Sequence, residues 1–137
     1  MSNYQNEASN SAARAIIEAR AQQNTFWRML GIEVLDAGDG WVRLRLPLRD
    51  DLRNGPGAPL HGGALATLHE SSAGGTGQAS LDANVSFIGA VREGAAVVDG
   101  RIIRRGGTIA FGEAEVRDET GALAAKGRAT YMILRPR

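Results

Sequence analysis

Residues 59 to 70 read Pro-Leu-His-Gly-Gly-Ala-Leu-Ala-Thr-Leu-His-Glu, and this stretch decides how the rest of the chain is organised. It begins as a turn-rich loop and continues as an apolar segment that suits a helix. Two adjacent glycines, Gly62 and Gly63, allow a ligand to approach the backbone closely where the helix begins. The first N–H groups of a helix have no acceptor within it, and the helix dipole makes that end partly positive. We therefore predict a helix start that can stabilise a developing oxyanion.

Glu70 lies further along this predicted helix. The three-to-four-residue spacing leaves it off the apolar stripe, which is formed by Ala64, Leu65 and Leu68. Nine residues separate His61 from Glu70, which on a helix gives about 900° of rotation, or half a turn, and roughly 13.5 Å of rise. One chain therefore cannot aim both the first helical N–H groups and Glu70 at the same small group. If both act on one carbonyl group, they come from two copies related by a two-fold axis, so the stretch predicts at least a dimer.

Composition narrows the class of protein. The chain has 137 residues, which suits one domain with a substantial core, and its 16 basic and 15 acidic residues leave a formal net charge of +1. Such a balance argues against a general nucleic-acid binder. Without cysteine there is no disulfide, thiol nucleophile or cysteine-based zinc site, and two histidines are too few for a histidine-rich metal cluster. No stretch approaches the length of a membrane span and the polar start is unlike a secretory signal, so we expect a cytoplasmic protein with no membrane partner.

The first part of the chain reads as an addition to the main domain. Residues 1–10 are polar and are expected to be mobile, and an alanine-rich helix is expected from Ser11, as its cap, to about Gln23. A bulky cluster should then pin this helix to the body: Phe26, Trp27, Met29 and Leu30. We accordingly divide the chain into residues 1–25, a polar tail with a helix, and residues 26–137, the main domain.

The remainder alternates between strands and glycine-rich turns. Period-two alternation places Arg43 and Arg45 on the face opposite to the apolar residues Val42, Leu44, Leu46 and Leu48. Residues 49–60 hold two prolines and two glycines and are expected to be irregular, and glycines should end the central helix near residue 73 or 74. Gly106-Gly107 suits a two-residue hairpin. Expected strands cover residues 31–36, 41–48, 79–88, 95–105, 108–118 and 122–134, which gives an α+β domain whose antiparallel sheet is covered on one side.

Several motifs recur in one known family. They are Leu30-Gly31-Ile32-Glu33, His61-Gly62-Gly63 with Glu70 nine residues on, Asp82-Ala83-Asn84-Val85-Ser86-Phe87, Arg104-Arg105-Gly106 and Lys126-Gly127-Arg128-Ala129-Thr130-Tyr131. Together they resemble the hotdog-fold acyl-CoA thioesterases, most closely the phenylacetate-pathway type, over residues 26–134. The resemblance implies an antiparallel sheet wrapped around a central helix, here with an extra N-terminal helix. It also implies dimers that join their sheets, often paired into tetramers, with the active site at the dimer interface.

By this resemblance, the expected activity is hydrolysis of an acyl-CoA or aryl-CoA thioester. The N–H of Gly62 would polarise the thioester carbonyl, and Glu70 of the other subunit would act as nucleophile or as general base for water. His61 would help to hold the loop and the substrate in place. Asn54 is the nearest candidate for the polar residue of the preceding loop, one position further from His61 than is usual in the family. Coenzyme A is part of the substrate, and no other cofactor is implied.

Substrate-binding roles are expected for three further residues. Gly63 shares the helix start, and Arg104 and Arg105 could contact the phosphates of coenzyme A. Arginines that flank a hairpin turn are equally typical of a charged sheet edge. Asp82 with Asn84 could orient a water molecule, or could simply lie on the outer face of a strand.

Two other functions remain open. One is a hotdog protein that binds acyl-CoA without cleaving it, as a sensor or carrier. The glycines after Glu70 favour this function, because the family's central helix usually continues further, and the position one turn beyond the acid is Gly74. The other is a dehydratase or hydratase, which would need a histidine and an acid that converge. The neighbours His69 and Glu70 lie about 100° apart around a helix and do not converge. Against the sensor or carrier, the acid at Glu70 favours the thioesterase.

Overall fold

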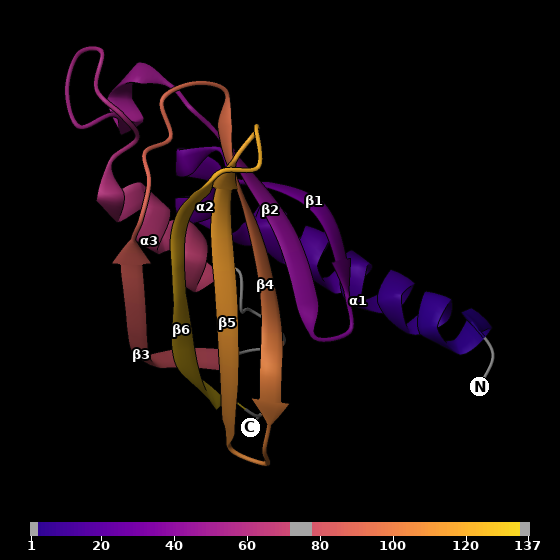
Figure 1. Cartoon of the computed structure of the whole chain (residues 1–137). Coiled ribbons are helices and arrows are strands. Elements are labelled where there is room, and N and C mark those ends of the chain that lie inside the picture. The colour runs from indigo at the N-terminus through magenta and orange to yellow at the C-terminus, as the bar shows by residue number, and fades with distance from the viewer. Residues whose placement is uncertain (1–2, 72–77, 135–137) are drawn as a thin grey trace.

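The computed structural model describes the backbone of residues 3–71 and 78–134, with the side chains of residues 7–66 and 79–134. In this described part, six strands form one antiparallel sheet in the order β1-β2-β4-β5-β6-β3 (Figure 1). The arrangement confirms the expected α+β hotdog fold. The elements, in chain order, are α1 (Asn3–Gln23), α2 (Thr25–Leu30), β1 (Glu33–Gly38), β2 (Trp41–Pro47), a short 3₁₀ helix (Asp50–Leu52), α3 (Gly62–Ser71), β3 (Gln78–Phe87), β4 (Ala95–Arg105), β5 (Ile109–Asp118) and β6 (Leu123–Ile133).

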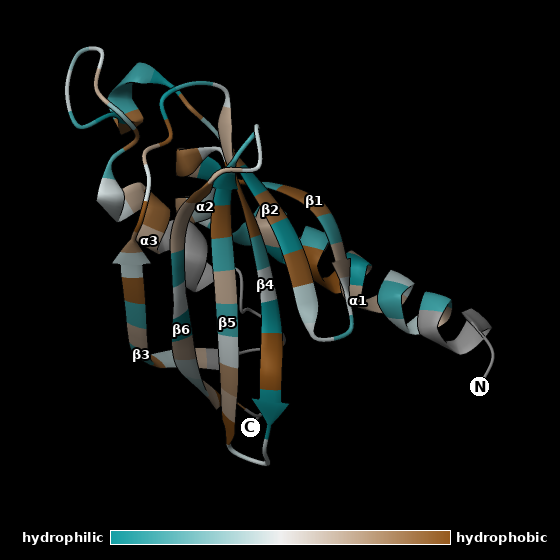
Figure 2. Cartoon of the chain, in the orientation of Figure 1, coloured by the Kyte–Doolittle hydropathy of each residue, from teal (hydrophilic) through white to brown (hydrophobic). Residues whose placement is uncertain are grey.

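The alternating strands have one buried and one exposed face, as the sequence predicts. In β2 the side chains of Val42, Leu44 and Leu46 are buried, whereas Arg43 is exposed. The alternation is visible as bands of opposite hydropathy along β2 (Figure 2). Each fully buried aliphatic side chain stabilises the fold by roughly 1.5–3 kcal/mol, so the register of the strand is strongly specified.

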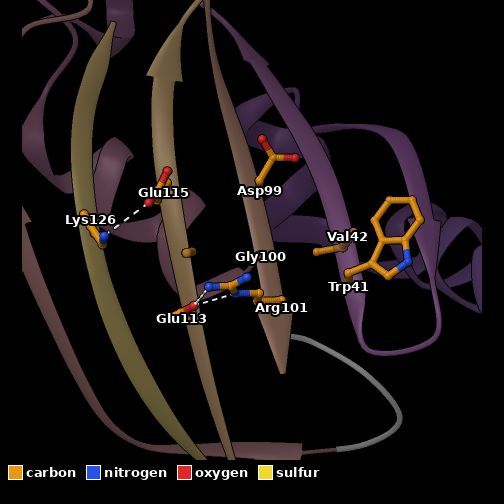
Figure 3. Close-up of a pocket in the computed structure, with 9 residues that line it drawn as sticks. Trp41, Val42, Asp99, Gly100, Arg101, Glu113, Glu115 and Lys126 are labelled. Atoms are coloured by element: carbon orange, nitrogen blue, oxygen red, sulfur yellow. Dashed lines mark hydrogen bonds and ion pairs between the residues drawn. The ribbon is translucent and has the colours of Figure 1, made fainter. Parts of the chain in front are cut away.

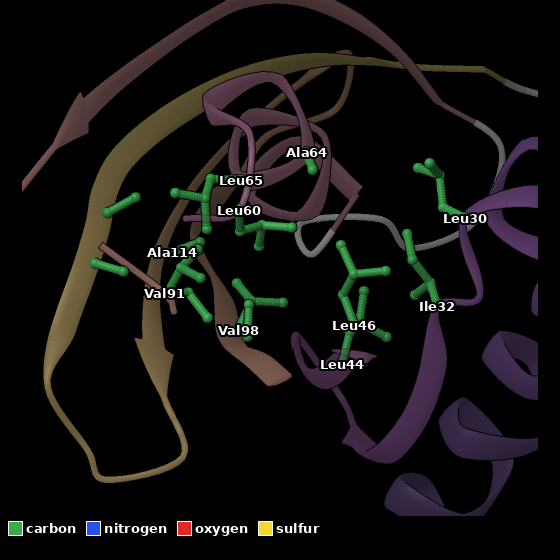
Figure 4. Packing of buried hydrophobic residues seen from close by; sticks show 14 of the residues in the cluster. Leu30, Ile32, Leu44, Leu46, Leu60, Ala64, Leu65, Val91, Val98 and Ala114 are labelled. Carbon is green, nitrogen blue, oxygen red and sulfur yellow. The ribbon is translucent and has the colours of Figure 1, made fainter. Parts of the chain in front are cut away.

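The central helix α3 covers the apolar face of this sheet. It contacts β3, β4, β5 and β6. Ala64 and Leu65 of α3 lie in the same buried cluster as Leu60 just before it and Val98 and Ala114 of the sheet (Figure 4). The predicted apolar stripe is therefore confirmed at its first two positions, while the side chain of the third, Leu68, lies outside the described residues. The expected helix end near residue 73 or 74 and the position of Gly74 also lie outside them.

The predicted start of the N-terminal helix was wrong, whereas its predicted end at about Gln23 is confirmed. Helix α1 begins at Asn3, so residues 3–10 are helical and Ser11 lies inside the helix rather than at its cap. A tertiary contact supports the early turns, because Asn10 Oδ1 accepts a hydrogen bond of 3.0 Å from the N–H of Asp39 in the β1–β2 turn. Ile17 is buried in the core, which fixes the other half of α1. Local propensity gave no sign of the contact between Asn10 and the turn.

Helix α2 only partly plays the pinning role expected of it. Leu30 is buried and Trp27 packs against the core, but Phe26 and Met29 are exposed. The helix ends at Gly31, whose left-handed φ of 82° lets its N–H reach two carbonyl groups of α2. Two further carbonyls at this end accept hydrogen bonds from the guanidinium of Arg49, at 2.7 and 2.8 Å. The arginine therefore ties α2 to the start of the loop that leads to α3.

Residues 49–60 are more regular than expected. They contain the 3₁₀ helix and an isolated antiparallel bridge between Arg53 and Leu60. The β4–β5 connection also differs slightly from a Gly106-Gly107 two-residue turn. Strand β5 begins only at Ile109, and the N–H of Gly106 donates to the carbonyl of Ile109 at 2.8 Å.

The two edges of the sheet differ. Strand β1 is covered by α1, with which it makes extensive contact. Strand β3 pairs with β6 on one side and, among the described residues, with no strand on the other. Its side chains Leu81 and Phe87 are exposed. A long edge strand with exposed apolar side chains is a ready template for pairing with another chain.

Candidate functional site

The start of α3 is held by His61, which caps it. The carbonyl of His61 accepts from the N–H groups of Ala64 and Leu65, at 2.9 and 3.2 Å, and its own N–H donates to the carbonyl of Leu52 at 2.8 Å. The imidazole Nδ1 accepts from the N–H of Gly63 at 2.8 Å. Because Nδ1 accepts this hydrogen bond, Nε2 is the imidazole nitrogen left to carry a proton. The imidazole is exposed, and its hydrogen bond caps the first turn of α3.

This cap leads to a prediction about stability. We expect His61→Ala to lower the free energy of unfolding by about 1 kcal/mol, because the N–H of Gly63 loses its acceptor. We expect His61→Asn to keep most of the stability, because the Asn carbonyl oxygen is a good cap acceptor at this position. Urea unfolding of the three proteins measures the difference. An unchanged free energy of unfolding in His61→Ala would show that the cap contributes nothing.

Gly62 is the first residue of α3, and its N–H has no acceptor in the described part of the chain. A methyl group on Gly62 would lie 3.4 Å from Cε1 of Phe87 at the end of β3, an ordinary contact distance. A methyl group on Gly63 would instead lie 2.9 Å from Nδ1 of His61. Gly63 therefore allows the cap to form, while Gly62 presents a donor that no described residue accepts from.

The loop before α3 is fixed at several points. The Arg53 guanidinium donates to the carbonyls of Ala58 and Arg92, at 2.8 and 3.1 Å, and its Nε lies 3.2 Å from Oδ1 of Asp50. The N–H of Leu60 donates to the carbonyl of Val91 at 2.8 Å. These contacts place the helix start against the segment that leads from β3 to β4. Sequence reasoning gave Arg53 no role, since two of its three partners are carbonyl groups and one belongs to a distant loop.

The other predicted site residues are not all near this helix start. The side chain of Glu70 lies outside the described residues, although its backbone is in α3. Asn54 is exposed in the loop, and its N–H donates to the carbonyl of Pro59 at 3.0 Å. Arg104 and Arg105 end β4, at the hairpin far from the start of α3 (Figure 1). One chain therefore does not bring these arginines to Gly62.

The sheet also carries a hollow of about 260 Å³ on the face opposite to α3 (Figure 3). The charged side chains that line it are paired across strands: Arg101 with Glu113, Lys126 with Glu115, and Asp99 with Arg43, which lies outside the lining. Hydrogen bonds from Arg117 and then Lys126 hold the pKa of Glu115 below its usual value. Each charged side chain in the hollow thus has a partner of opposite charge, and the hollow lies away from the start of α3.

Metal binding finds no support among the described residues. No three His, Cys, Asp or Glu side chains in that part of the chain gather closely enough to hold a metal ion. In the same described part of the chain, no helix is both long and apolar enough to cross a membrane.

The known proteins that this chain resembles point to one superfamily. Residues 60–125 match the thioesterase superfamily. A Halobacterium salinarum protein whose name marks it as a candidate esterase is 31% identical, and the match covers 90% of this chain and 93% of that protein. An X-ray structure of a protein from the thioesterase superfamily is also 31% identical, covers 90% of this chain and 99% of its own, and superimposes with a TM-score of 0.83.

A second solved structure bears on the expected branch. The Escherichia coli PaaI protein, from the phenylacetic acid degradation operon, superimposes with a TM-score of 0.80 over 87% of this chain and 91% of its own. Its sequence identity is 15%, so the likeness shows a shared fold alone. Assignment to the phenylacetate-pathway type stays a prediction.

Proposed function

Because this chain belongs to the thioesterase superfamily, we propose that it hydrolyses the thioester bond of an acyl-CoA or aryl-CoA to a free acid and coenzyme A. The observation that carries the proposal is the start of α3. There a capped helix presents the Gly62 N–H without an acceptor among the described residues. A thioester carbonyl that accepts from this N–H would gain negative charge where the donor and the helix dipole favour it.

Hydrolysis also needs a group that forms the new bond. In our proposal the Glu70 carboxylate either attacks the carbonyl carbon itself or removes a proton from the water molecule that attacks it. The Gly62 N–H stabilises the tetrahedral oxyanion, the carbon–sulfur bond breaks, and the thiolate of coenzyme A leaves and takes up a proton. Where Glu70 itself attacks, this step leaves a mixed anhydride on the carboxylate, and a water molecule then hydrolyses it to the free acid and restores Glu70. His61 keeps the Gly62 N–H in place through its cap, and Asn54 is proposed to contact the substrate from the loop.

The proposed site combines two protomers. Eight residues separate Gly62, the first residue of α3, from Glu70, which gives two full turns plus about 80° and roughly 12 Å of rise, too far for one carbonyl group. Antiparallel pairing of two β3 edges would set the Phe87 end of one strand opposite the Gln78 end of its partner. Such pairing would bring the second half of the partner's α3 towards Gly62. It would bring the partner's hairpin, with Arg104 and Arg105, in the same direction, where the arginines could bind phosphates of coenzyme A.

A panel of acyl-CoA and aryl-CoA thioesters tests the activity. Release of free thiol from the purified protein, followed with a thiol-reactive chromophore, should show turnover of at least one member. Sedimentation of the same sample should show a dimer or tetramer. Tight binding without thiol release across the panel would instead identify an acyl-CoA sensor or carrier, and a monomer would contradict the two-protomer site.

A further inference from the structure

Phe87 is an apolar side chain that the chain leaves exposed beside Gly62. It is the last residue of β3 and lies on the inner face of the sheet, since its register partner, Ala125, is fully buried. Val85, two residues earlier on the same face, packs against the core. Phe87 nevertheless remains 58% exposed. Its neighbours on this face are apolar, so they do not explain this exposure. What distinguishes Phe87 is its position next to the start of α3.

The ring lies close to the donor that the proposed reaction uses. Its carbons Cε1, Cζ and Cδ1 lie 3.4, 3.7 and 3.8 Å from the place that a methyl group on Gly62 would occupy. The described part of the chain therefore presents a hydrogen-bond donor beside an exposed apolar ring, and none of its residues accepts from that donor. A ligand that suits both has a carbonyl group bonded directly to an apolar group.

From this juxtaposition we propose that Phe87 is a specificity-determining residue that packs against the acyl group of the thioester. The inference rests on the proposed function, because it places the thioester carbonyl at the Gly62 N–H. With the oxygen held there, the acyl group next to the carbonyl carbon is placed beside the ring. Phe87 therefore favours an aryl or branched group next to the carbonyl, since such a group covers the ring and acetyl does not.

The Phe87 ring could instead contact the partner protomer, because β3 is a sheet edge with no paired strand among the described residues. A contact between protomers would affect assembly and every substrate alike. A contact with the acyl group would change the preference among substrates and leave assembly unchanged. These two outcomes can be measured on the same variants.

The experiment compares kcat/KM for acetyl-CoA and for the best bulky thioester of the panel. In Phe87→Ala we expect the preference for the bulky thioester to fall by about tenfold or more, the scale of effect of lost pocket contacts. Phe87→Leu should lose less. Phe111→Ala is the matched control, because Phe111 is also an exposed phenylalanine on a strand but lies on the outer face, between the buried Ala110 and Gly112.

Two results would overturn the inference. One is an equal fall for both substrates in Phe87→Ala, and the other is dissociation of the oligomer in that variant. If the wild-type protein hydrolyses no thioester, the proposed function fails separately. Calorimetric affinities for benzoyl-CoA and acetyl-CoA then replace the rates, and unchanged relative affinity in Phe87→Ala would overturn the role of Phe87 independently.

Discussion

Gly62→Pro is expected to lower kcat by about 10²–10³-fold, the usual effect of removing one oxyanion donor. Gly62 is the first residue of α3, where proline is well tolerated because its missing N–H has no acceptor within the helix. Its φ does not lie in the left-handed region, so the position does not demand glycine. The substitution therefore removes the donor and keeps the helix. Thiol release from the best substrate of the panel measures the loss.

The matched control is Gly62→Ala, which adds a Cβ as proline does but keeps the N–H. Its methyl group would make an ordinary contact with Phe87 rather than a clash. We expect the alanine variant to stay within about tenfold of the wild-type rate, so the gap between alanine and proline reports the N–H itself. Equal losses in the two variants would assign the effect to the added carbon and remove the oxyanion role.

Glu70→Gln is expected to lower kcat by about 10²–10⁴-fold, the range for loss of a general base. Glutamine keeps the size and hydrogen-bonding capacity of the side chain but can neither attack as a carboxylate nor accept the proton from water. The measurement is single-turnover and steady-state thiol release at saturating substrate. Thermal unfolding should be unchanged, because only the charge of the side chain is altered.

The control for this variant is Glu7→Gln, which neutralises an exposed carboxylate on α1. It should hydrolyse the panel as the wild type does. If Glu70→Gln keeps the wild-type rate, Glu70 is not the reacting acid and the proposed reaction needs another carboxylate.

Much of the fold could be predicted because its pattern is local. The alternation around Arg43 and the apolar stripe that begins at Ala64 report burial directly, since each depends on residues close in the sequence. The early start of α1 could not be predicted, because it depends on the contact between Asn10 and the turn at Asp39. Residues 3–10 have a polar composition that, taken alone, favours a mobile tail.

The same distinction between local and long-range signals applies to the site. The cap by His61 and the unused N–H of Gly62 follow from a short motif at a helix start, and both are found in the structure. The places of Arg53 and Phe87 depend on loops and strands that meet only in the folded chain. In the sequence Phe87 is one apolar residue of an alternating strand, and its nearness to Gly62 has no local signal.

The most direct test of the shared site is the activity of heterodimers. Co-expression of Gly62→Pro and Glu70→Gln protomers with two different affinity tags yields heterodimers that can be purified. If each site takes its Gly62 from one protomer and its Glu70 from the other, one of the two sites in this heterodimer is intact. We therefore predict about half of the wild-type activity, although each parent homodimer is inactive.

A crossed heterodimer supplies the opposite arrangement. It pairs a wild-type protomer with one that carries both substitutions, so every shared site contains one altered residue. The shared-site account predicts about half of the wild-type rate in the first heterodimer and nearly none in the second. An inactive first heterodimer together with a half-active second would contradict it, because both groups would then act within one chain.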